Sequence, residues 1–284
     1  MVTEERLTRP DGLLVTPEEL CGTGVLVLAG SSGRVDTERA RLLGRFGAMA
    51  ASIRWFGGQG QQPQPFEVPL ETFAKALDHL APHCDRLAVV GTSFGAEAAL
   101  LTAIHDARVD AVVAFAPTPV VWAGIDAGRD GRSERVTSHW TLKGVPLPFV
   151  PFDDEWQPVT APPSFRGLYE QSLLRHPEAA RRAAIPVERI RGEVLVVGGE
   201  DDQVWPGADF ARAVAARRRD HGLDTQVVTS SRAGHRTVLP GEPAVEAGAA
   251  MARGGDPSSD AQLGALVWPA LVTMLRLNVS SGQA

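Results

Sequence analysis

The sequence predicts an α/β protein built on a mainly parallel sheet that is flanked by helices and covered by an inserted cap. Short apolar runs without polar alternation are separated by segments with helical spacing, a pattern typical of βαβ units whose strands are buried on both faces. The alternation is interrupted once, by a long stretch rich in Pro, Trp and Phe. A chain of 284 residues is long enough for one such domain with an insertion.

The expected elements follow one another in this alternating order. Six strands are expected within the apolar runs 24–33, 47–57, 86–93, 109–117, 192–202 and 224–235. Helices are expected between them, at 36–47, 69–83, 95–107 and 207–222. Residues 232–262 predict a long loop, and 261–277 predict a final helix that is kinked or starts late because of Pro269.

The interruption of the alternation divides the chain into a core and a cap. Residues 118–185 are too many for a plain loop between two strands, and they include a short helical piece at 168–184. Open α/β sheets bind ligands at the carboxyl edge of the sheet, so we expect this cap to cover that edge. The core is then expected to comprise 1–117 and 186–284.

Composition argues against several functional classes. The net charge of −6 gives no electrostatic support to binding of nucleic acid or an anionic membrane. No apolar run reaches 18 residues and the first residues lack a signal-peptide pattern, so a cytoplasmic protein is expected. Cys21 and Cys84 form no Cys-x-x-Cys pair, and the acidic run 153–155 has no further ligands at metal spacing. Neither a metal nor a cofactor is expected.

The first candidate for chemistry is Ser93, which lies between two glycines in Gly91-Thr92-Ser93-Phe94-Gly95. An apolar run precedes this pentapeptide and a helical pattern follows it, which is the strand–turn–helix context of a nucleophile elbow. A side chain at either glycine would crowd the close approach of strand and helix. The helix N-terminus would favour an oxyanion beside the serine. A simple turn that contains serine is the alternative.

A serine nucleophile needs a base, and the base needs an orienting acid. In α/β hydrolases the chain order is Ser, then Asp or Glu, then His. Asp201 and Asp202 follow one apolar run, and His235 lies in the loop after the last strand. A Gly-x-x-Asp pattern that begins at Gly199 favours Asp202 as the acid, with Asp201 as a neighbour that caps the turn. The sequence therefore predicts a triad of Ser93, Asp202 and His235.

Further residues are expected around this triad. One oxyanion donor is the backbone N–H of Phe94, and the second is that of Ser31 or Ser32 in the loop after the first strand. A simple Gly/Ser turn is the alternative for that loop. Trp205 and Trp122 are candidates for contact with substrate, and structural packing is the alternative. The other six histidines are expected at the surface: His79, His83, His105, His139, His176 and His221.

Several motifs together resemble the C-terminal catalytic domain shared by acyl-CoA thioesterases and bile acid-CoA:amino acid N-acyltransferase. They are "GTSFGAEAALL" at the elbow, "VVAFAPTPVVWAG", "WTLKGVPLPFVPF", "IPVERIRGEVLVVGGEDDQVWP" around the acid, "AGH" at the base and "GGDP" before the last helix. The resemblance covers most of 24–277 and implies an α/β-hydrolase fold. It also implies Ser93 as nucleophile, Asp202 as acid and His235 as base.

Two departures from this family qualify the resemblance. Its longer members carry a β-sandwich domain in front of the catalytic domain, whereas about 23 residues precede the first expected strand here. We therefore expect that domain to be absent and substrate recognition to differ. The N-acyltransferase uses a cysteine nucleophile, whereas the thioesterases have serine, as this chain does at Ser93. The chain thus resembles the hydrolytic branch.

These observations predict a serine hydrolase that cleaves an activated acyl thioester of coenzyme A or of a carrier protein. The alternatives are an acyltransferase to an amine or alcohol, a carboxylesterase or lactone hydrolase, and a non-catalytic relative that binds an acyl ligand. The expected partner is a small-molecule acyl thioester or ester, free or attached to a carrier protein. The sequence leaves the acyl chain, the acceptor and the oligomeric state open.

Overall fold

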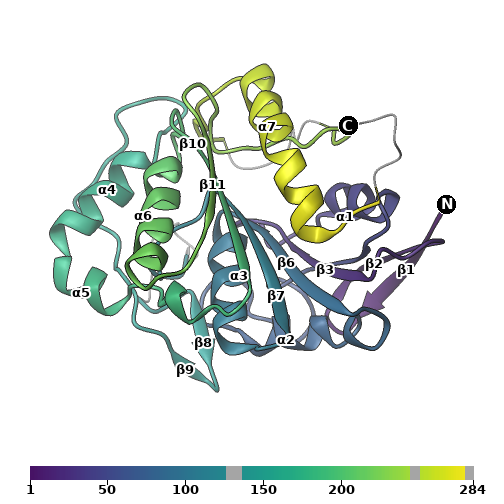
Figure 1. Ribbon diagram of the computed structural model, residues 1–284. Coiled ribbons are helices and arrows are strands. Elements are labelled where there is room, and N and C mark those ends of the chain that lie inside the picture. Colours follow the sequence, from purple (N-terminus) through teal and green to yellow (C-terminus); the bar gives the residue numbers. More distant parts are fainter. Residues whose placement is uncertain (126–135, 244–249, 279–284) are drawn as a thin grey trace.

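The computed structural model describes residues 1–125, 136–243 and 250–278 and confirms the predicted α/β class. An eight-stranded sheet has the order β1-β2-β4-β3-β6-β7-β10-β11 (Figure 1). Six of its strands are parallel, namely β3 (Thr23–Leu28), β4 (Met49–Ile53), β6 (Arg86–Thr92), β7 (Val109–Phe115), β10 (Glu193–Gly199) and β11 (Gln226–Ser230). The parallel strands bring their carboxyl ends to one edge of the sheet.

Two antiparallel strands at one end of the sheet, β1 (Val2–Thr8) and β2 (Asp11–Pro17), were not predicted. The expectation that about 23 residues precede the first strand is therefore wrong, because β2 pairs with β4 and β1 pairs with β2. Most of β1 is exposed, since it is an edge strand, and an exposed polar strand gives no apolar run in the sequence. The hairpin extends the same sheet.

Helices cover both faces of the sheet, as the continuous apolar runs predict. On one face lie α1 (Thr37–Arg45) and α7 (Pro257–Leu275). On the other lie α2 (Glu71–Leu77), α3 (Phe94–His105) and α6 (Gly207–Asp220). Successive residues of β3 alternate between two cores: Val25 packs on the first face and Leu26 on the second. Among the described residues, none of the helices has both the length and the apolarity needed to cross a membrane.

The boundaries of the last helix differ from the prediction. Helix α7 starts at Pro257, before the expected position, because Asp256 caps its N-terminus and accepts hydrogen bonds from the N–H groups of Ser258 and Ser259 at 2.8 and 2.9 Å. Pro269 lies inside the helix, which continues past it to Leu275. The expectation of a late start was therefore wrong, since the capping aspartate and the proline at the first helical position fix the start.

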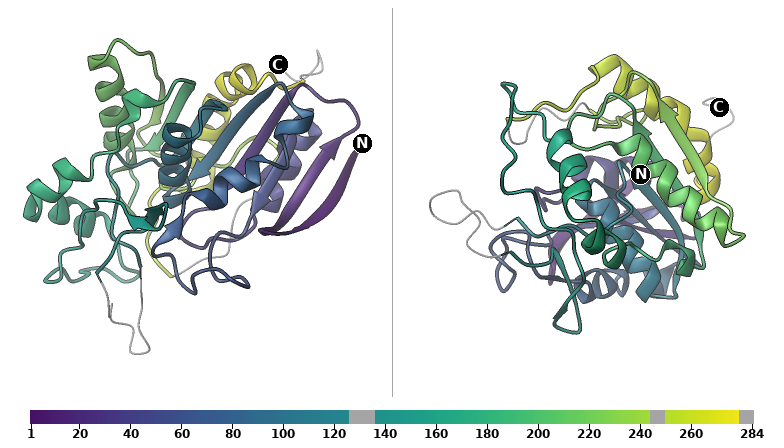
Figure 2. Two further views of the ribbon diagram at one scale, coloured as in Figure 1. Left: turned by 90° about the horizontal axis from the view of Figure 1, so that it is seen from below. Right: turned by 90° about the vertical axis from the view of Figure 1, so that its left-hand side faces the viewer.

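We call residues 118–185 the intervening segment, and its helices α4 (Arg166–Arg175) and α5 (Pro177–Arg182) lie at the opposite side of the molecule from the β1–β2 hairpin (Figures 1 and 2). The segment also contains β8 (Trp140–Leu142) and β9 (Val145–Pro146), and the part of the predicted cap at 126–135 lies outside the described residues. Strand β8 pairs with β5 (Val68–Pro69) of the preceding part. The expected helix at 69–83 is divided into α2 and a 3₁₀ turn at Ala81–His83.

Candidate active site

Ser93 occupies a strained turn between β6 and α3. Its backbone angles are φ 59° and ψ −125°, which side-chain-bearing residues rarely adopt. Neither of the flanking positions, 91 and 95, has room for a side chain. A Cβ on Gly91 would lie 2.0 Å from the carbonyl oxygen of Gly95, and a Cβ on Gly95 would lie 2.3 Å from that of Ala29. The predicted reason for both glycines is therefore confirmed.

Backbone groups hold this turn against two neighbouring loops. The Ser93 N–H donates to the carbonyl of Phe115 at the end of β7, at 2.8 Å. A Cβ on Gly30 would lie 3.1 Å from the Cβ of Ser93, so the turn after β3 is packed directly against the serine. Phe94 is the first residue of α3, and its N–H has no acceptor within the helix. The role of this N–H as an oxyanion donor stays a prediction.

Asp202 and His235 are joined by a hydrogen bond of 2.8 Å between Oδ2 and Nδ1. The other carboxyl oxygen of Asp202 accepts the backbone N–H groups of Val204 and Trp205, at 2.8 and 3.2 Å. Asp202 is fully buried, whereas His235 and Ser93 are 9% and 7% exposed. Both oxygens of this carboxyl are thus committed to fixed donors, which holds the imidazole with Nδ1 toward Asp202.

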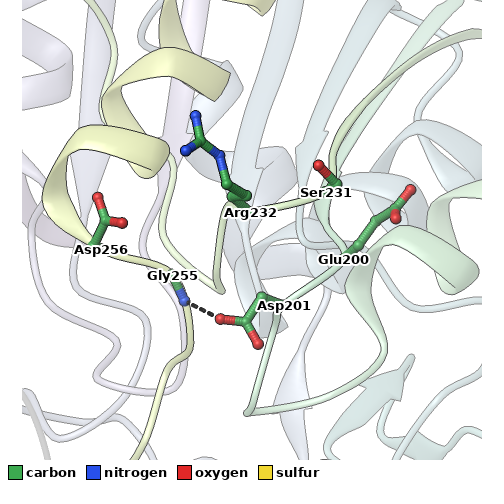
Figure 3. A pocket seen from close by; sticks show the side chains of 6 residues that line it. All are labelled: Glu200, Asp201, Ser231, Arg232, Gly255 and Asp256. Atoms are coloured by element: carbon green, nitrogen blue, oxygen red, sulfur yellow. Dashed lines mark hydrogen bonds between the residues drawn. The ribbon is translucent and has the colours of Figure 1, made fainter.

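Asp201, the neighbouring acid, faces a different part of the molecule. Its Oδ2 accepts the N–H of Gly255 at 2.8 Å, and Figure 3 shows it in a surface pocket. The lining of that pocket includes neither Ser93 nor His235 and consists of Glu200, Asp201, Ser231, Arg232, Gly255 and Asp256. Asp201 therefore ties the loop after β10 to the start of α7, while Asp202 contacts the histidine.

The structure places the two candidate serines of the oxyanion loop in an exposed turn. The turn is closed by a hydrogen bond of 2.9 Å from the N–H of Gly33 to the carbonyl of Gly30. The N–H groups of Ser31 and Ser32 make no hydrogen bond to any part of the chain that the structure describes. Their role as oxyanion donors stays a prediction.

The two candidate tryptophans differ in position. The Trp205 ring lies edge-on to the rings of Phe94 and His235, with centroid distances of 5.4 and 5.5 Å, so it connects the elbow to the histidine. Trp122 lies farther into the intervening segment, where its indole N–H donates to Thr118 Oγ1 at 2.8 Å. Both indoles are fully buried. Contact with substrate remains a prediction for both.

Sequence analysis missed a buried carboxyl beneath the elbow. Glu97, one helical turn after Ser93, accepts the Trp140 indole N–H at 2.8 Å and the Trp122 backbone N–H at 3.2 Å through the same oxygen, Oε1. Its Oε2 is buried without a partner among the described residues. Burial raises the pKa of Glu97 well above its ordinary value, although these two hydrogen bonds oppose the shift. Its position on an alanine-rich, fully buried stretch of α3 was the available signal.

His139 also lies near the elbow, and its predicted surface position is wrong. The imidazole is fully buried and stacks on the Phe94 ring, with 4.3 Å between centroids. Burial lowers the pKa of His139 to about 3, so the ring is neutral. The sequence could not show this, because Phe94 and Trp55, which pack on the imidazole, lie in distant segments of the chain, whereas Trp140 is its sequence neighbour.

Comparison with known proteins shows the family to which this chain is related. Residues 68–280 match the family described as BAAT / acyl-CoA thioester hydrolase C terminal. The chain is 24% identical over 227 residues to acyl-coenzyme A amino acid N-acyltransferase 2 of Mus musculus, covering 78% of this chain and 50% of that protein. It is also 24% identical over 281 residues to acyl-coenzyme A thioesterase 1 of Mus musculus, covering 95% of this chain and 63% of that protein.

A solved structure shares the fold at low sequence identity. The Pyrococcus horikoshii acylaminoacyl peptidase is 9% identical, with a TM-score of 0.57, over 96% of this chain and 41% of that one. This likeness supports the fold alone. The chain spans 50% and 63% of the two curated relatives. Because the family match covers most of the sequence, the chain belongs to the BAAT / acyl-CoA thioester hydrolase C-terminal family.

Proposed function

We propose that the protein is a serine hydrolase that cleaves an activated acyl thioester through Ser93, His235 and Asp202. The observation that carries this proposal is the 2.8 Å hydrogen bond between His235 Nδ1 and a fully buried Asp202. The strained elbow at Ser93 supports it, because such strain is concentrated at functional sites. The names of the relatives, acyl-coenzyme A thioesterase and N-acyltransferase, support a thioester as the substrate.

In the proposed mechanism, Ser93 Oγ attacks the thioester carbonyl while its proton passes to His235. Because Nδ1 is engaged by Asp202, Nε2 is the nitrogen left to accept that proton. The N–H groups of Phe94 and of Ser31 or Ser32 stabilise the oxyanion, and one such donor is typically worth about 10²–10³ in kcat. The C–S bond then breaks, and the leaving sulfur takes the proton from the imidazolium.

The second half of the reaction uses the same residues. His235 removes a proton from water, which attacks the acyl-Ser93 carbonyl, and the carboxylic acid leaves as the proton returns to Ser93. Asp202 stabilises the imidazolium in both halves. The intervening segment would act as the cap that limits access of water, since Ser93 and His235 are only 7% and 9% exposed. That low exposure also favours the second candidate function, transfer of the acyl group to an amine or alcohol.

Thiol release from a panel of acyl-CoA thioesters tests the proposal. The wild-type chain is compared with Ser93→Ala, and an oxygen ester is assayed alongside. Ser93→Ala should lower turnover by at least about 10⁴-fold while circular dichroism shows an intact fold. Added amine or alcohol that is acylated at the expense of hydrolysis would identify an acyltransferase. Turnover that persists in Ser93→Ala would overturn the nucleophile, and cleavage of the oxygen ester alone would overturn the thioester substrate.

A further inference from the structure

One buried arginine contacts the elbow and the loop of the candidate base together. Arg39 of α1 donates through Nη1 to Thr92 Oγ1 at 3.0 Å and through Nη2 to the Thr237 carbonyl at 2.9 Å. Thr92 immediately precedes Ser93, and Thr237 comes two residues after His235. The guanidinium also lies over the Phe115 ring, 4.6 Å from its centroid.

Phe115 adds a further connection to the nucleophile. Its carbonyl accepts the N–H of Ser93. Arg39 itself lies in the first turns of α1, the helix that follows the loop of Ser31 and Ser32. The Arg39 guanidinium therefore contacts the ends of two strands beside Ser93 and also the loop that carries His235. It extends from the helix that follows the proposed oxyanion loop.

The charge of this guanidinium is balanced within the protein. Arg39 Nε and Nη2 donate to the two carboxyl oxygens of Glu242, at 2.7 and 2.9 Å, and both side chains are only 7% exposed. Burial would lower the pKa of Arg39, but the adjacent Glu242 carboxylate raises it above the ordinary value. Glu242 Oε2 also accepts the N–H of Leu239, which fixes the same loop. The pair is therefore charged, bidentate and enclosed.

A gain in the free energy of unfolding does not by itself explain a buried ion pair of this kind. Removing two charges from water is unfavourable and offsets much of their attraction, and apolar residues of similar volume often stabilise a protein as well or better. A fixed fork of donors does, however, set the relative positions of its acceptors. Here the acceptors are the hydroxyl of Thr92, beside the Ser93 elbow, and the carbonyl of Thr237, in the loop of His235. The distance between the elbow and that loop decides whether His235 can take a proton from Ser93.

We propose that Arg39, held by Glu242, is a positioning residue that keeps the Ser93 elbow and the His235 loop at reacting distance. This inference rests on the proposed triad. Misplacement of reacting groups by about 1 Å can cost about 10²-fold in rate. Loss of the fork should therefore slow acylation of Ser93 far more than it weakens binding of substrate.

The chain offers a matched control in Arg218 of α6. That side chain is also buried, 3% exposed, and donates to the carbonyls of Val187 and Ile190 at 2.8 and 3.0 Å. Neither acceptor belongs to a loop of the proposed triad. Arg39→Lys and Arg218→Lys thus remove the same guanidinium from two buried sites, of which only one adjoins Ser93 and His235.

The test measures the rate at which a fluorophosphonate probe labels Ser93, together with kcat, KM and thermal unfolding. We expect Arg39→Lys to lower the labelling rate and kcat by about 10²-fold, with KM changed by less than about threefold. Arg218→Lys should lower the unfolding temperature by a similar amount and leave the labelling rate of the folded protein unchanged.

A second pair of variants keeps the test decisive if Arg39→Lys does not fold. Thr92→Val removes only the bond from Arg39 to the elbow and should slow labelling by about three- to tenfold. Thr102→Val is its control, because the Thr102 hydroxyl is buried without a partner among the described residues and lies away from both loops. We expect Thr102→Val to label at the wild-type rate.

Three different results would count against one or both of the proposals. Equal labelling of wild type, Thr92→Val and folded Arg39→Lys would overturn the positioning role while leaving the triad intact. A wild-type Ser93 that does not react with the probe would overturn the triad itself, and the role of Arg39 with it. A loss of labelling in Arg218→Lys as large as that in Arg39→Lys would assign the effect to stability.

Discussion

Two buried carboxyl groups, Asp202 and Glu97, each accept the backbone N–H of a buried tryptophan. The Trp205 backbone N–H donates to Asp202, and the Trp122 backbone N–H donates to Glu97. Tyr169 packs edge-on against both indoles, with centroids 4.7 Å from Trp122 and 5.2 Å from Trp205. The two regions therefore share a buried carboxyl, a tryptophan N–H that donates to it, and contact of that indole with Tyr169.

The partners of the two carboxyls differ, and with them the chemistry. Both oxygens of Asp202 have donors, one of them the imidazole of His235. Glu97 offers one oxygen to two N–H donors and buries the other without a partner in the described chain. Burial raises the pKa of Glu97, and its Oε1 joins α3 to the intervening segment. Both carboxyls are thus buried, and their hydrogen-bond donors differ. Only the carboxyl that faces an imidazole, Asp202, can orient a histidine base.

The largest expected effect that separates the two regions is that of Asp202→Asn. The amide cannot stabilise an imidazolium and favours the wrong tautomer of His235, so kcat should fall by about 10⁴-fold with little change in fold. Steady-state kinetics and circular dichroism of the variant measure this. An activity within tenfold of wild type would mean that Asp202 is not the orienting acid.

Glu97→Ala should act on stability. Removing this carboxyl leaves the Trp140 indole N–H and the Trp122 N–H buried without an acceptor, and each such group costs about 1–3 kcal/mol. We expect a loss of about 2–4 kcal/mol in the free energy of unfolding, measured by urea denaturation. Glu97→Gln keeps the acceptor oxygen and should stay within about 1 kcal/mol of wild type. Equal stability of all three proteins would contradict the structural role.

The pH dependence of stability sharpens the same distinction. The pKa of Glu97 is raised in the folded protein above its ordinary value of 4.5, so its contribution to stability is fully present below that value. The contribution is lost as the pH rises through the folded pKa. The free energy of unfolding of wild type, measured relative to Glu97→Gln, should therefore fall as the pH rises above 4.5. A difference independent of pH would show that Glu97 does not titrate in this way.

The smallest effect is expected at Asp201, the acid beside Asp202. Its Oδ2 accepts from Gly255, and Asn at this position keeps one acceptor oxygen. Asp201→Asn should leave kcat within about twofold of wild type, since the side chain does not contact His235. The same kinetic assay is used as for Asp202→Asn. A loss like that expected for Asp202→Asn would transfer the role of acid to Asp201.

Local patterns in the sequence were sufficient for the sheet core and for the elbow. Apolar runs predict strands covered on both faces because burial of that kind leaves no polar alternation. The glycines at 91 and 95 predict the tight turn, because a Cβ at either position would lie only 2.0 or 2.3 Å from a backbone carbonyl oxygen. Such signals are encoded within a few residues. The exposed β1 strand carries no comparable signal, and it was missed.

The order of Ser93, Asp202 and His235 along the chain was therefore enough to name the candidate triad, and the contact between the last two is now seen at 2.8 Å. Only the tertiary structure decided which other polar residues lie beside it. Arg39 and Glu242 are 203 residues apart, and Glu97 meets Trp140 across 43 residues. Whether a buried side chain is charged depends on its partners and on its desolvation. The residues that flank it in the sequence specify neither.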